Sequence, residues 1–216
     1  MSDAQGIIGR ALDFARETFA GDASGHDFWH TWRVWRLALH LAEAECADTE
    51  TVQLAAILHD VDDAKLSPDT AAEKLRARRF LEGEGVPEET VRRILHIIGQ
   101  VSYKGADTEK PDSPEGMCVQ DADRLDAIGA IGIARTFAFG GSRGRAIWDP
   151  EEAPRTNLDE HSYRTGGGCT VNHFYEKLLL LRDLMNTRTA HRLADERHRV
   201  METFLDEFYA EWRGEK

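Results

Sequence analysis

Residues 52–65 read VQLAAILHDVDDAK. The apolar run VQLAAIL has helical spacing, and His59 and Asp60 follow it side by side. Asp63 comes four residues after His59, which places both on one face if the helix continues. A core helix usually ends in a cap or at a polar surface, whereas this one ends in a nitrogen ligand beside an oxygen ligand. The stretch predicts part of a divalent-metal site, and the alternative is a buried hydrogen-bonded pair at a helix end.

Length and composition indicate one globular domain. The chain has 216 residues, of which 41% are hydrophobic and 31% charged, enough for one good-sized core. We expect a single domain over residues 1–216, with a His/Asp metal core at about 25–140. A Gly- and Pro-rich loop at 140–169 and a C-terminal pair of helices at 170–213 complete it.

The charge balance limits the partners. Lys and Arg number 27 against 39 Asp and Glu, so the formal charge is 27 − 39 = −12. This charge disfavours non-specific binding to nucleic acid or to a membrane surface. The three cysteines form no C-x-x-C pair, the first ten residues lack a basic start followed by a long apolar stretch, and no run approaches the length of a membrane helix. We therefore expect a cytoplasmic protein with a small phosphorylated partner, and a homodimer is compatible with the sequence.

The remaining segments are helical in pattern. Residues 27–45 place His30 on an apolar face with Val34, Leu37 and Leu41. Residues 117–140 predict one long helix in which Asp123 shares a stripe with small residues, although Asp121 or Asp126 stays an alternative. No segment has the period-two alternation of a strand, so the predicted fold class is all-α.

Inward-facing His30, His59, Asp60 and Asp123 come from three predicted helices. Two imidazoles and two carboxylates suit six-coordinate Mn²⁺, Mg²⁺ or Fe²⁺ better than a structural zinc site, with Ni²⁺ as a further alternative and Mn²⁺ preferred. Four ligands in six coordination leave positions for water and substrate. The set therefore predicts catalysis, while the alternative for His30 alone is a hydrogen-bonded core histidine.

These residues stand in an order that resembles the HD-domain metal-dependent phosphohydrolases. The similarity extends from about residue 25 to residue 208. The sequence around these residues is similar to a stand-alone bacterial branch of the superfamily, the HD-domain nucleotide pyrophosphohydrolases. Four segments carry it: GHDFWHTWRVW (25–35), LAAILHDVDDAKL (54–66), VQDADRLDAIGAIGIARTF (119–137) and NHFYEKLLLLRDLMNTRTA (172–190).

The resemblance implies a role for each matching residue. His30, His59, Asp60 and Asp123 would hold the metal, and Asp63 would position or deprotonate the attacking water. The expected reaction is hydrolysis of a nucleoside triphosphate to a monophosphate and pyrophosphate. Two-metal members of the superfamily carry additional histidines before the final Asp, but only His96 lies in that interval here, which favours one metal.

Cations and further histidines are candidates for substrate binding. Lys65 is placed by sequence to meet phosphate charge and joins Asp63 as a catalytic candidate. A loop or surface role is the alternative for His26 and His96, and Arg33 could instead pair with a ligand carboxylate. The substrate-binding candidates are Arg33, His26, His96, Arg124, His173 and Lys177.

Two other functions use the same residues. A phosphomonoesterase would release orthophosphate from a nucleotide monophosphate or small phosphoester. A non-catalytic sensor would bind a nucleotide without turnover.

Overall fold

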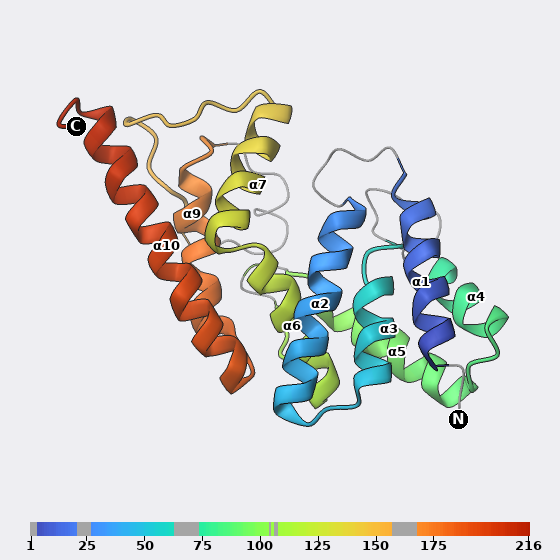
Figure 1. Cartoon of the computed structure of the whole chain (residues 1–216). Helices are drawn as coiled ribbons and strands as arrows, with labels where there is room; N and C mark the ends of the chain where they lie inside the picture. Colours follow the sequence, from blue (N-terminus) through green and yellow to red (C-terminus); the bar gives the residue numbers. More distant parts are fainter. Residues whose placement is uncertain (1–3, 21–26, 63–73, 104, 106–107, 157–167) are drawn as a thin grey trace. The chain divides into compact units, whose positions relative to one another are not determined.

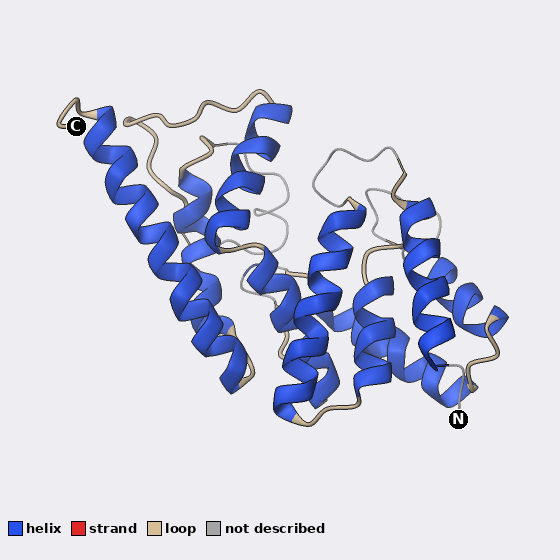
Figure 2. Ribbon diagram, viewed as in Figure 1, coloured by secondary structure: helices blue, strands red, loops and turns tan. Residues whose placement is uncertain are grey.

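The computed structural model describes residues 4–20, 27–62, 74–103, 105, 108–156 and 168–216. Within these ranges the chain forms helices and connecting loops and no strand (Figure 2), which confirms the all-α prediction. The contacts divide the chain into two compact units. The first comprises Met1–Tyr103 with Glu109–Asp123, and the second comprises Lys104–Thr108 with Arg124–Lys216. The single-domain boundaries stay a prediction.

Helix α3 is the centre of the first unit. It contacts α1, α2 and α5, and it runs beside α2 in the opposite direction (Figure 1). All but one of the residues from Thr51 to Asp62 are buried, as expected for a helix that is apolar all round. The helices that belong wholly to this unit are α1 (Ala4–Thr18), α2 (Phe28–Glu45), α3 (Thr49–Leu58), α4 (Leu75–Gly83) and α5 (Glu88–Val101).

Helix α6 (Pro114–Asp126) begins in the first unit. The carboxylate of Glu115, in its first turn, pairs with Arg93 of α5 at 2.9 Å and accepts a hydrogen bond from the backbone N–H of Asp48. Asp48 in turn caps α3 by accepting from the backbone N–H of Glu50. These contacts fix the start of α6 against the start of α3.

The second unit is built around α10 (Arg188–Trp212), which contacts α7 (Gly129–Ser142) and the 3-10 helix η2 (Leu178–Leu184) (Figure 1). The short helix α9 (Asn172–Glu176) precedes η2. Phe174 of α9 stacks on Phe204 of α10 with ring centroids 5.8 Å apart, and Phe137 of α7 lies 5.6 Å from the same ring. Aromatic side chains from three helices therefore pack together in this unit.

The predicted helix over 117–140 is wrong in one respect, because the structure divides it into α6 and α7. Gly129 has φ +74°, which ends helical geometry at a residue that lacks a Cβ. At Gly132 an added Cβ would lie 2.2 Å from the carbonyl oxygen of Ala127. The two glycines thus permit a tight turn between helices rather than packing within one, and Asp123 shares no continuous stripe with Ala130.

Candidate metal centre

The first turn of α2 holds His30. Asp27 is the N-cap residue, and its Oδ1 accepts a hydrogen bond from the backbone N–H of His30 at 2.9 Å. An N-cap carboxylate satisfies one of the N–H groups that the first helical turn leaves without an intrahelical partner. His30 is 1% exposed. Its imidazole is therefore anchored through the backbone and directed into the unit.

His59 and Asp60 lie in the turn that follows α3. The helix ends at Leu58, so the predicted helical continuation towards Asp63 is wrong for the described residues 59–62, which form a turn. His59 Nδ1 lies 2.8 Å from the carbonyl oxygen of Ala56. A carbonyl oxygen can only accept, so Nδ1 carries the proton and Nε2 offers its lone pair in the neutral ring.

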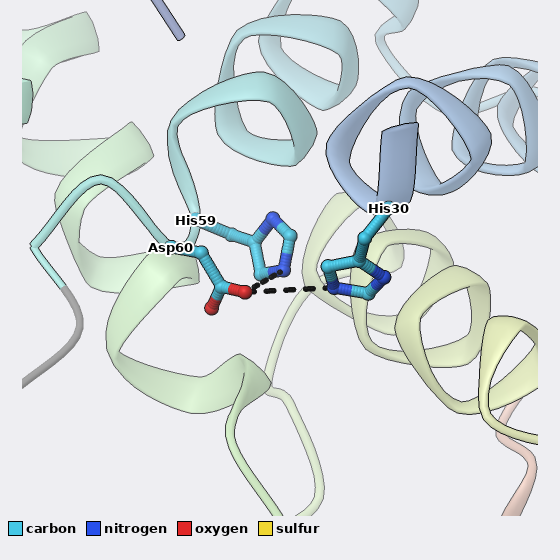
Figure 3. Close-up of side chains that lie close together, drawn as sticks. All are labelled: His30, His59 and Asp60. Atoms are coloured by element: carbon cyan, nitrogen blue, oxygen red, sulfur yellow. Dashed lines mark ion pairs between the residues drawn. The ribbon is translucent and has the colours of Figure 1, made fainter. Parts of the chain in front are cut away.

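Four side chains from α2, the turn after α3, and α6 converge. Figure 3 shows that both imidazoles point towards one Asp60 oxygen, Oδ2, which lies 3.5 Å from His30 Nε2 and 3.3 Å from His59 Nε2. Asp123 Oδ1 lies 3.4 Å and 3.9 Å from the same two nitrogens. Ligand atoms around one metal ion at bond lengths of about 2.0–2.2 Å are separated by about 3–3.5 Å. Three of these four separations lie within that range, and the separation of Asp123 Oδ1 from His59 Nε2, 3.9 Å, exceeds it.

The electrostatics of the cluster also favour a cation. Burial of the ring lowers the pKa of His59, but the Asp60 carboxylate, with Asp123 beyond it, outweighs burial and raises the pKa of His59 to about 9. His59 Nε2 is buried and makes no hydrogen bond within the described part of the chain. A divalent cation can replace the proton on this buried nitrogen, which faces carboxylates as a metal ligand does. His30, His59 and Asp60 therefore fit a divalent metal, and Asp123 is the fourth ligand that we propose.

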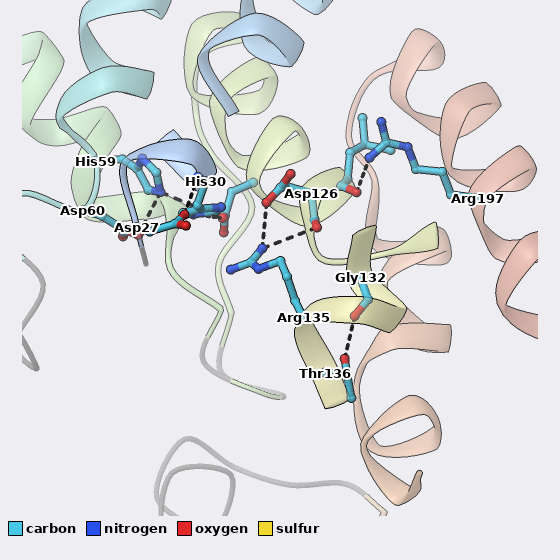
Figure 4. A network of polar contacts seen from close by, with 11 residues as sticks. Asp27, His30, His59, Asp60, Asp126, Gly132, Arg135, Thr136 and Arg197 are labelled. Carbon is cyan, nitrogen blue, oxygen red and sulfur yellow. Dashed lines mark hydrogen bonds and ion pairs between the residues drawn. The ribbon is translucent and has the colours of Figure 1, made fainter. Parts of the chain in front are cut away.

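The alternatives to Asp123 have other surroundings. Asp126 belongs to the second unit, where its Oδ2 accepts a hydrogen bond from Arg135 Nη1 at 2.7 Å (Figure 4). Asp121 is fully buried. Asp123 Oδ1 lies 3.4 Å from His30 Nε2 and 3.9 Å from His59 Nε2. We keep Asp123 as the proposed ligand.

Two of the predicted substrate-binding residues, Arg33 and His96, belong to the first unit. Arg33 follows His30 by three residues in α2 and is partly exposed. His96 of α5 is exposed, and its Nε2 lies 2.9 Å from Asp112 Oδ2. A histidine with a carboxylate partner at the surface is consistent with the solvated alternative as well as with substrate binding.

Three other candidates belong to the second unit. Arg124 is buried and donates from Nη1 to the carbonyl oxygen of Leu184. Burial lowers the pKa of His173, and the Lys177 ammonium lowers it further, to about 3. Lys177 has φ −143° and lies between α9 and η2, so one continuous helix does not place it on a face with His173.

Asp63, Lys65 and His26 lie outside the described residues. Their assignments stay predictions.

Sequence patterns missed two kinds of contact. Asp62 accepts hydrogen bonds from the backbone N–H groups of Arg76 and Ala77, fourteen and fifteen residues further on. Glu176 accepts from Arg155 in a bidentate pair with distances of 2.9 Å to both Nε and Nη2. Neither pair has a local sequence signal, because its members lie far apart in the chain.

Comparison with known proteins places this geometry in a family. The HD domain model matches residues 28–128, a range that includes the four proposed metal ligands. The chain belongs to the HD-domain superfamily. Among curated proteins, YpgQ of Bacillus subtilis (strain 168) is 42% identical over 187 residues, which cover 85% of this chain and 83% of that protein.

Crystal structures of bacterial relatives are similar over nearly the whole chain. A Lactobacillus plantarum protein has a TM-score of 0.86 and 41% identity, with 99% of both chains covered. An HD-superfamily hydrolase from Bacillus thuringiensis has a TM-score of 0.76 and 43% identity, covering 97% of this chain and 98% of that one. B. subtilis YpgQ in complex with ADP has a TM-score of 0.75 and 36% identity, with coverage of 94% and 97%. The superfamily prediction is confirmed, and the relatives are YpgQ-like bacterial proteins.

No helix among the described residues is long and apolar enough to cross a membrane. The cytoplasmic location, the absence of a nucleic-acid partner and the homodimer stay predictions.

Proposed function

We propose that this protein is a divalent-metal-dependent phosphohydrolase that converts a nucleoside triphosphate to a monophosphate and pyrophosphate. The observation that carries the proposal is the orientation of His59. Its Nδ1 is held by the Ala56 carbonyl, and its buried Nε2 faces the carboxylate of Asp60, with His30 and Asp123 around the same point. The membership of the HD-domain superfamily, which includes a hydrolase among the similar structures, supports hydrolysis as the reaction class.

A nucleotide is the proposed substrate. The crystal structure of YpgQ, a relative that matches nearly the whole chain, contains ADP. An adenine nucleotide bound to a relative supports a nucleotide ligand here, but it leaves the base, the sugar and the number of phosphates to experiment.

The proposed division of labour follows from the residue types. A divalent cation, Mn²⁺ by preference, would lower the pKa of water towards neutrality and withdraw charge from a phosphoryl oxygen. His30, His59, Asp60 and Asp123 would hold that cation. Asp63 would accept the proton of the attacking water, and Lys65 would stabilise the charge on the departing group.

The bond broken distinguishes this reaction from its alternatives. Attack of water on the α phosphorus breaks its bond to the oxygen that bridges the α and β phosphates, and the new oxygen stays with the monophosphate. Pyrophosphate leaves with the bridging oxygen. Arg33, Arg124, His173 and Lys177 are the cationic or hydrogen-bonding groups that we propose for the phosphates, with His26 and His96 as further candidates.

The test is product identification with labelled water. Metal-stripped protein receives Mn²⁺, Mg²⁺, Fe²⁺ or Ni²⁺ in ¹⁸O-enriched water, together with a panel of nucleoside tri- and monophosphates. Ion-exchange chromatography separates the products, and mass spectrometry locates the label. We expect monophosphate and pyrophosphate, with ¹⁸O in the monophosphate.

Two matched variants connect the reaction to the site. Asp60→Asn removes a proposed metal ligand, and Asp13→Asn makes the same chemical change on the exposed face of α1. We expect turnover to be lost in the first and kept in the second. Orthophosphate released from monophosphates would transfer the assignment to a phosphomonoesterase, and nucleotide binding without turnover with any of the four metals would favour the sensor.

A further inference from the structure

Asp62 follows the proposed ligands His59 and Asp60 within one turn, yet its carboxylate has a different use. The side chain is buried, with 4% of the residue exposed. Oδ1 accepts a hydrogen bond from the backbone N–H of Arg76 at 3.1 Å, and Oδ2 accepts from that of Ala77 at 2.9 Å. Both oxygens therefore face the start of α4.

These hydrogen bonds replace a missing helix cap. The residue at the N-cap position of α4, Lys74, has φ 50° and provides no side-chain cap. Arg76 and Ala77 are the second and third residues of α4, and their N–H groups are the ones that a capping side chain normally satisfies. A carboxylate at this end of a helix is also favoured by the helix dipole. Asp62 thus caps α4 from a turn that lies more than ten residues earlier in the chain.

Helix α4 is itself held in place by other elements. Ala77 and Leu81 are buried, and α4 packs against α5. Phe80 stacks on Phe14 of α1 with ring centroids 5.0 Å apart. Glu84, just beyond the helix, accepts a hydrogen bond from Arg10 of α1 at 2.7 Å. The hydrogen bonds of Asp62 therefore tie the turn after α3 to a fixed framework.

We propose that Asp62 is a positioning residue that holds the His59–Asp60 turn in its metal-binding geometry. The turn continues from α3 on one side, where the N–H of Val61 donates to the carbonyl of Leu58 at 3.4 Å. On the other side Asp62 anchors it to α4. Two residues of chain span at most about 7 Å, so fixing Asp62 restricts the displacement of the Asp60 carboxylate. The proposal rests on the metal centre of the proposed function and assigns no metal contact to Asp62.

The test compares caps at the two ends of α3. Asp62→Ala removes the cap beside His59, and Asp62→Asn keeps one acceptor oxygen. Asp48→Ala is the matched control, because Asp48 caps the opposite end of α3 through the N–H of Glu50 and the hydroxyl of Thr51. Ten helical residues separate the two ends by about 15 Å. For each variant, Mn²⁺ affinity is measured by calorimetry well below the unfolding temperature of that variant, and the thermal unfolding of the metal-free protein is measured in parallel.

We expect Asp62→Ala to weaken Mn²⁺ binding by about 10- to 100-fold, as for other residues that orient metal ligands. Asp62→Asn should lose less affinity. Asp48→Ala should keep its affinity within about twofold although its unfolding temperature falls, since it removes a cap and the ion pair with Arg93 at the far end of α3. Unchanged affinity in Asp62→Ala would overturn the proposal, and so would an equal loss in Asp48→Ala. If Asp62→Ala does not fold, Asp62→Asn decides by the same comparison.

A second readout separates this proposal from the proposed function. Amide hydrogen exchange of the segment 57–62 is measured in the metal-free protein. We expect faster exchange in Asp62→Ala than in Asp48→Ala, and no difference between them would overturn the positioning role. Absence of Mn²⁺ binding in the unmodified protein would instead contradict the metal centre, and the exchange result would still decide the role of Asp62.

Discussion

His59 shows how one side chain can be prepared for a metal before the metal arrives. The Ala56 carbonyl, three residues earlier in the same helical turn, fixes the tautomer by accepting from Nδ1. The ring is buried, and its free nitrogen faces carboxylates from two elements. A proton and a divalent cation therefore compete for the same nitrogen.

This competition predicts opposite effects of pH on the metal-free and metal-bound protein. The pKa of His59 is raised to about 9 from an ordinary value of 6.5. The charged imidazole therefore stabilises the metal-free fold fully below pH 6.5, and this contribution is lost as pH rises through about 9. The loss is at most about 1.4 kcal/mol per pH unit. We expect the unfolding temperature of the metal-free protein to fall over this range. The increase in unfolding temperature caused by Mn²⁺ should become larger over the same range.

Thermal unfolding with and without Mn²⁺ between pH 6.5 and 9 measures both slopes. The control is His59→Gln, which has no imidazole to titrate. In this variant the dependence of the unfolding temperature on pH should lose the part that His59 causes, both with and without Mn²⁺. A Mn²⁺ increment that stays constant over this range in the unmodified protein would contradict competition at His59.

At the scale of helices, the turn between α6 and α7 decides where the carboxylates of the ADRLD segment go. Asp126, the last residue of α6, pairs with Arg135 of α7 (Figure 4). Arg197 of α10 donates a hydrogen bond from Nη1 to the carbonyl oxygen of Leu125 in α6. The backbone of the turn lies so close to α7 that no side chain fits at Gly132. The turn therefore depends on the absence of a Cβ at this position.

Substitution of two glycines in α7 should have opposite effects. Gly132→Ala places a methyl group against the Ala127 carbonyl, and we expect a loss of about 1–3 kcal/mol in the free energy of unfolding. Gly141→Ala meets no atom within 4 Å and should stabilise the helix by up to about 1 kcal/mol. Urea unfolding of both variants checks the difference. Equal effects would show that helix propensity, rather than the close approach of Ala127, determines the outcome.

Arg155 is anchored to α9 by its pair with Glu176. Glu176 is buried, and burial raises the pKa of its carboxyl, but the hydrogen bonds from Arg155 outweigh burial and keep the pKa below its ordinary value. Removal of the guanidinium would leave a buried carboxylate without its main partner. The pair therefore contributes to stability mainly by offsetting the free-energy cost of burying the Glu176 carboxylate.

A double-mutant cycle measures this dependence. We expect Arg155→Gln to lower the free energy of unfolding by about 1–3 kcal/mol. The double variant, Arg155→Gln with Glu176→Gln, should lose less free energy of unfolding than the two single variants lose together, because the amide at position 176 needs no cation. Strict additivity would mean that the two side chains do not depend on each other.

At the scale of the whole chain, local patterns predicted most of the helices, while the ligand roles stay a prediction. Apolar periodicity located α2 and the buried helix α3, and the residue order His30, His59–Asp60, Asp123 matches the cluster that the structure brings together. The failures have a common physical cause. The break at Gly129 and the remote cap from Asp62 depend on contacts between segments, and helical periodicity carries no information about such contacts.

The two compact units also contain two histidines with opposite pKa shifts. His59 belongs to the first unit, and His173 belongs to the second. Burial and the nearby Lys177 ammonium lower the pKa of His173 to about 3 from an ordinary value of 6.5. The neutral ring is required by the fold, so its contribution to stability is complete above pH 6.5 and is lost as pH falls towards 3, by at most about 1.4 kcal/mol per pH unit.

We therefore expect acid to weaken the second unit through His173 and the metal to strengthen the first. Amide hydrogen exchange at pH 7 and pH 5, with exchange times corrected for the intrinsic pH dependence, should show lost protection in α9 and η2 on acidification. His173→Gln cannot titrate and should reduce that loss. Mn²⁺ at pH 7 should instead increase protection in α2 and at the end of α3, because bound ligand stabilises the elements that hold it. Equal loss of protection in α9 with and without the His173 imidazole would assign the acid sensitivity to other groups.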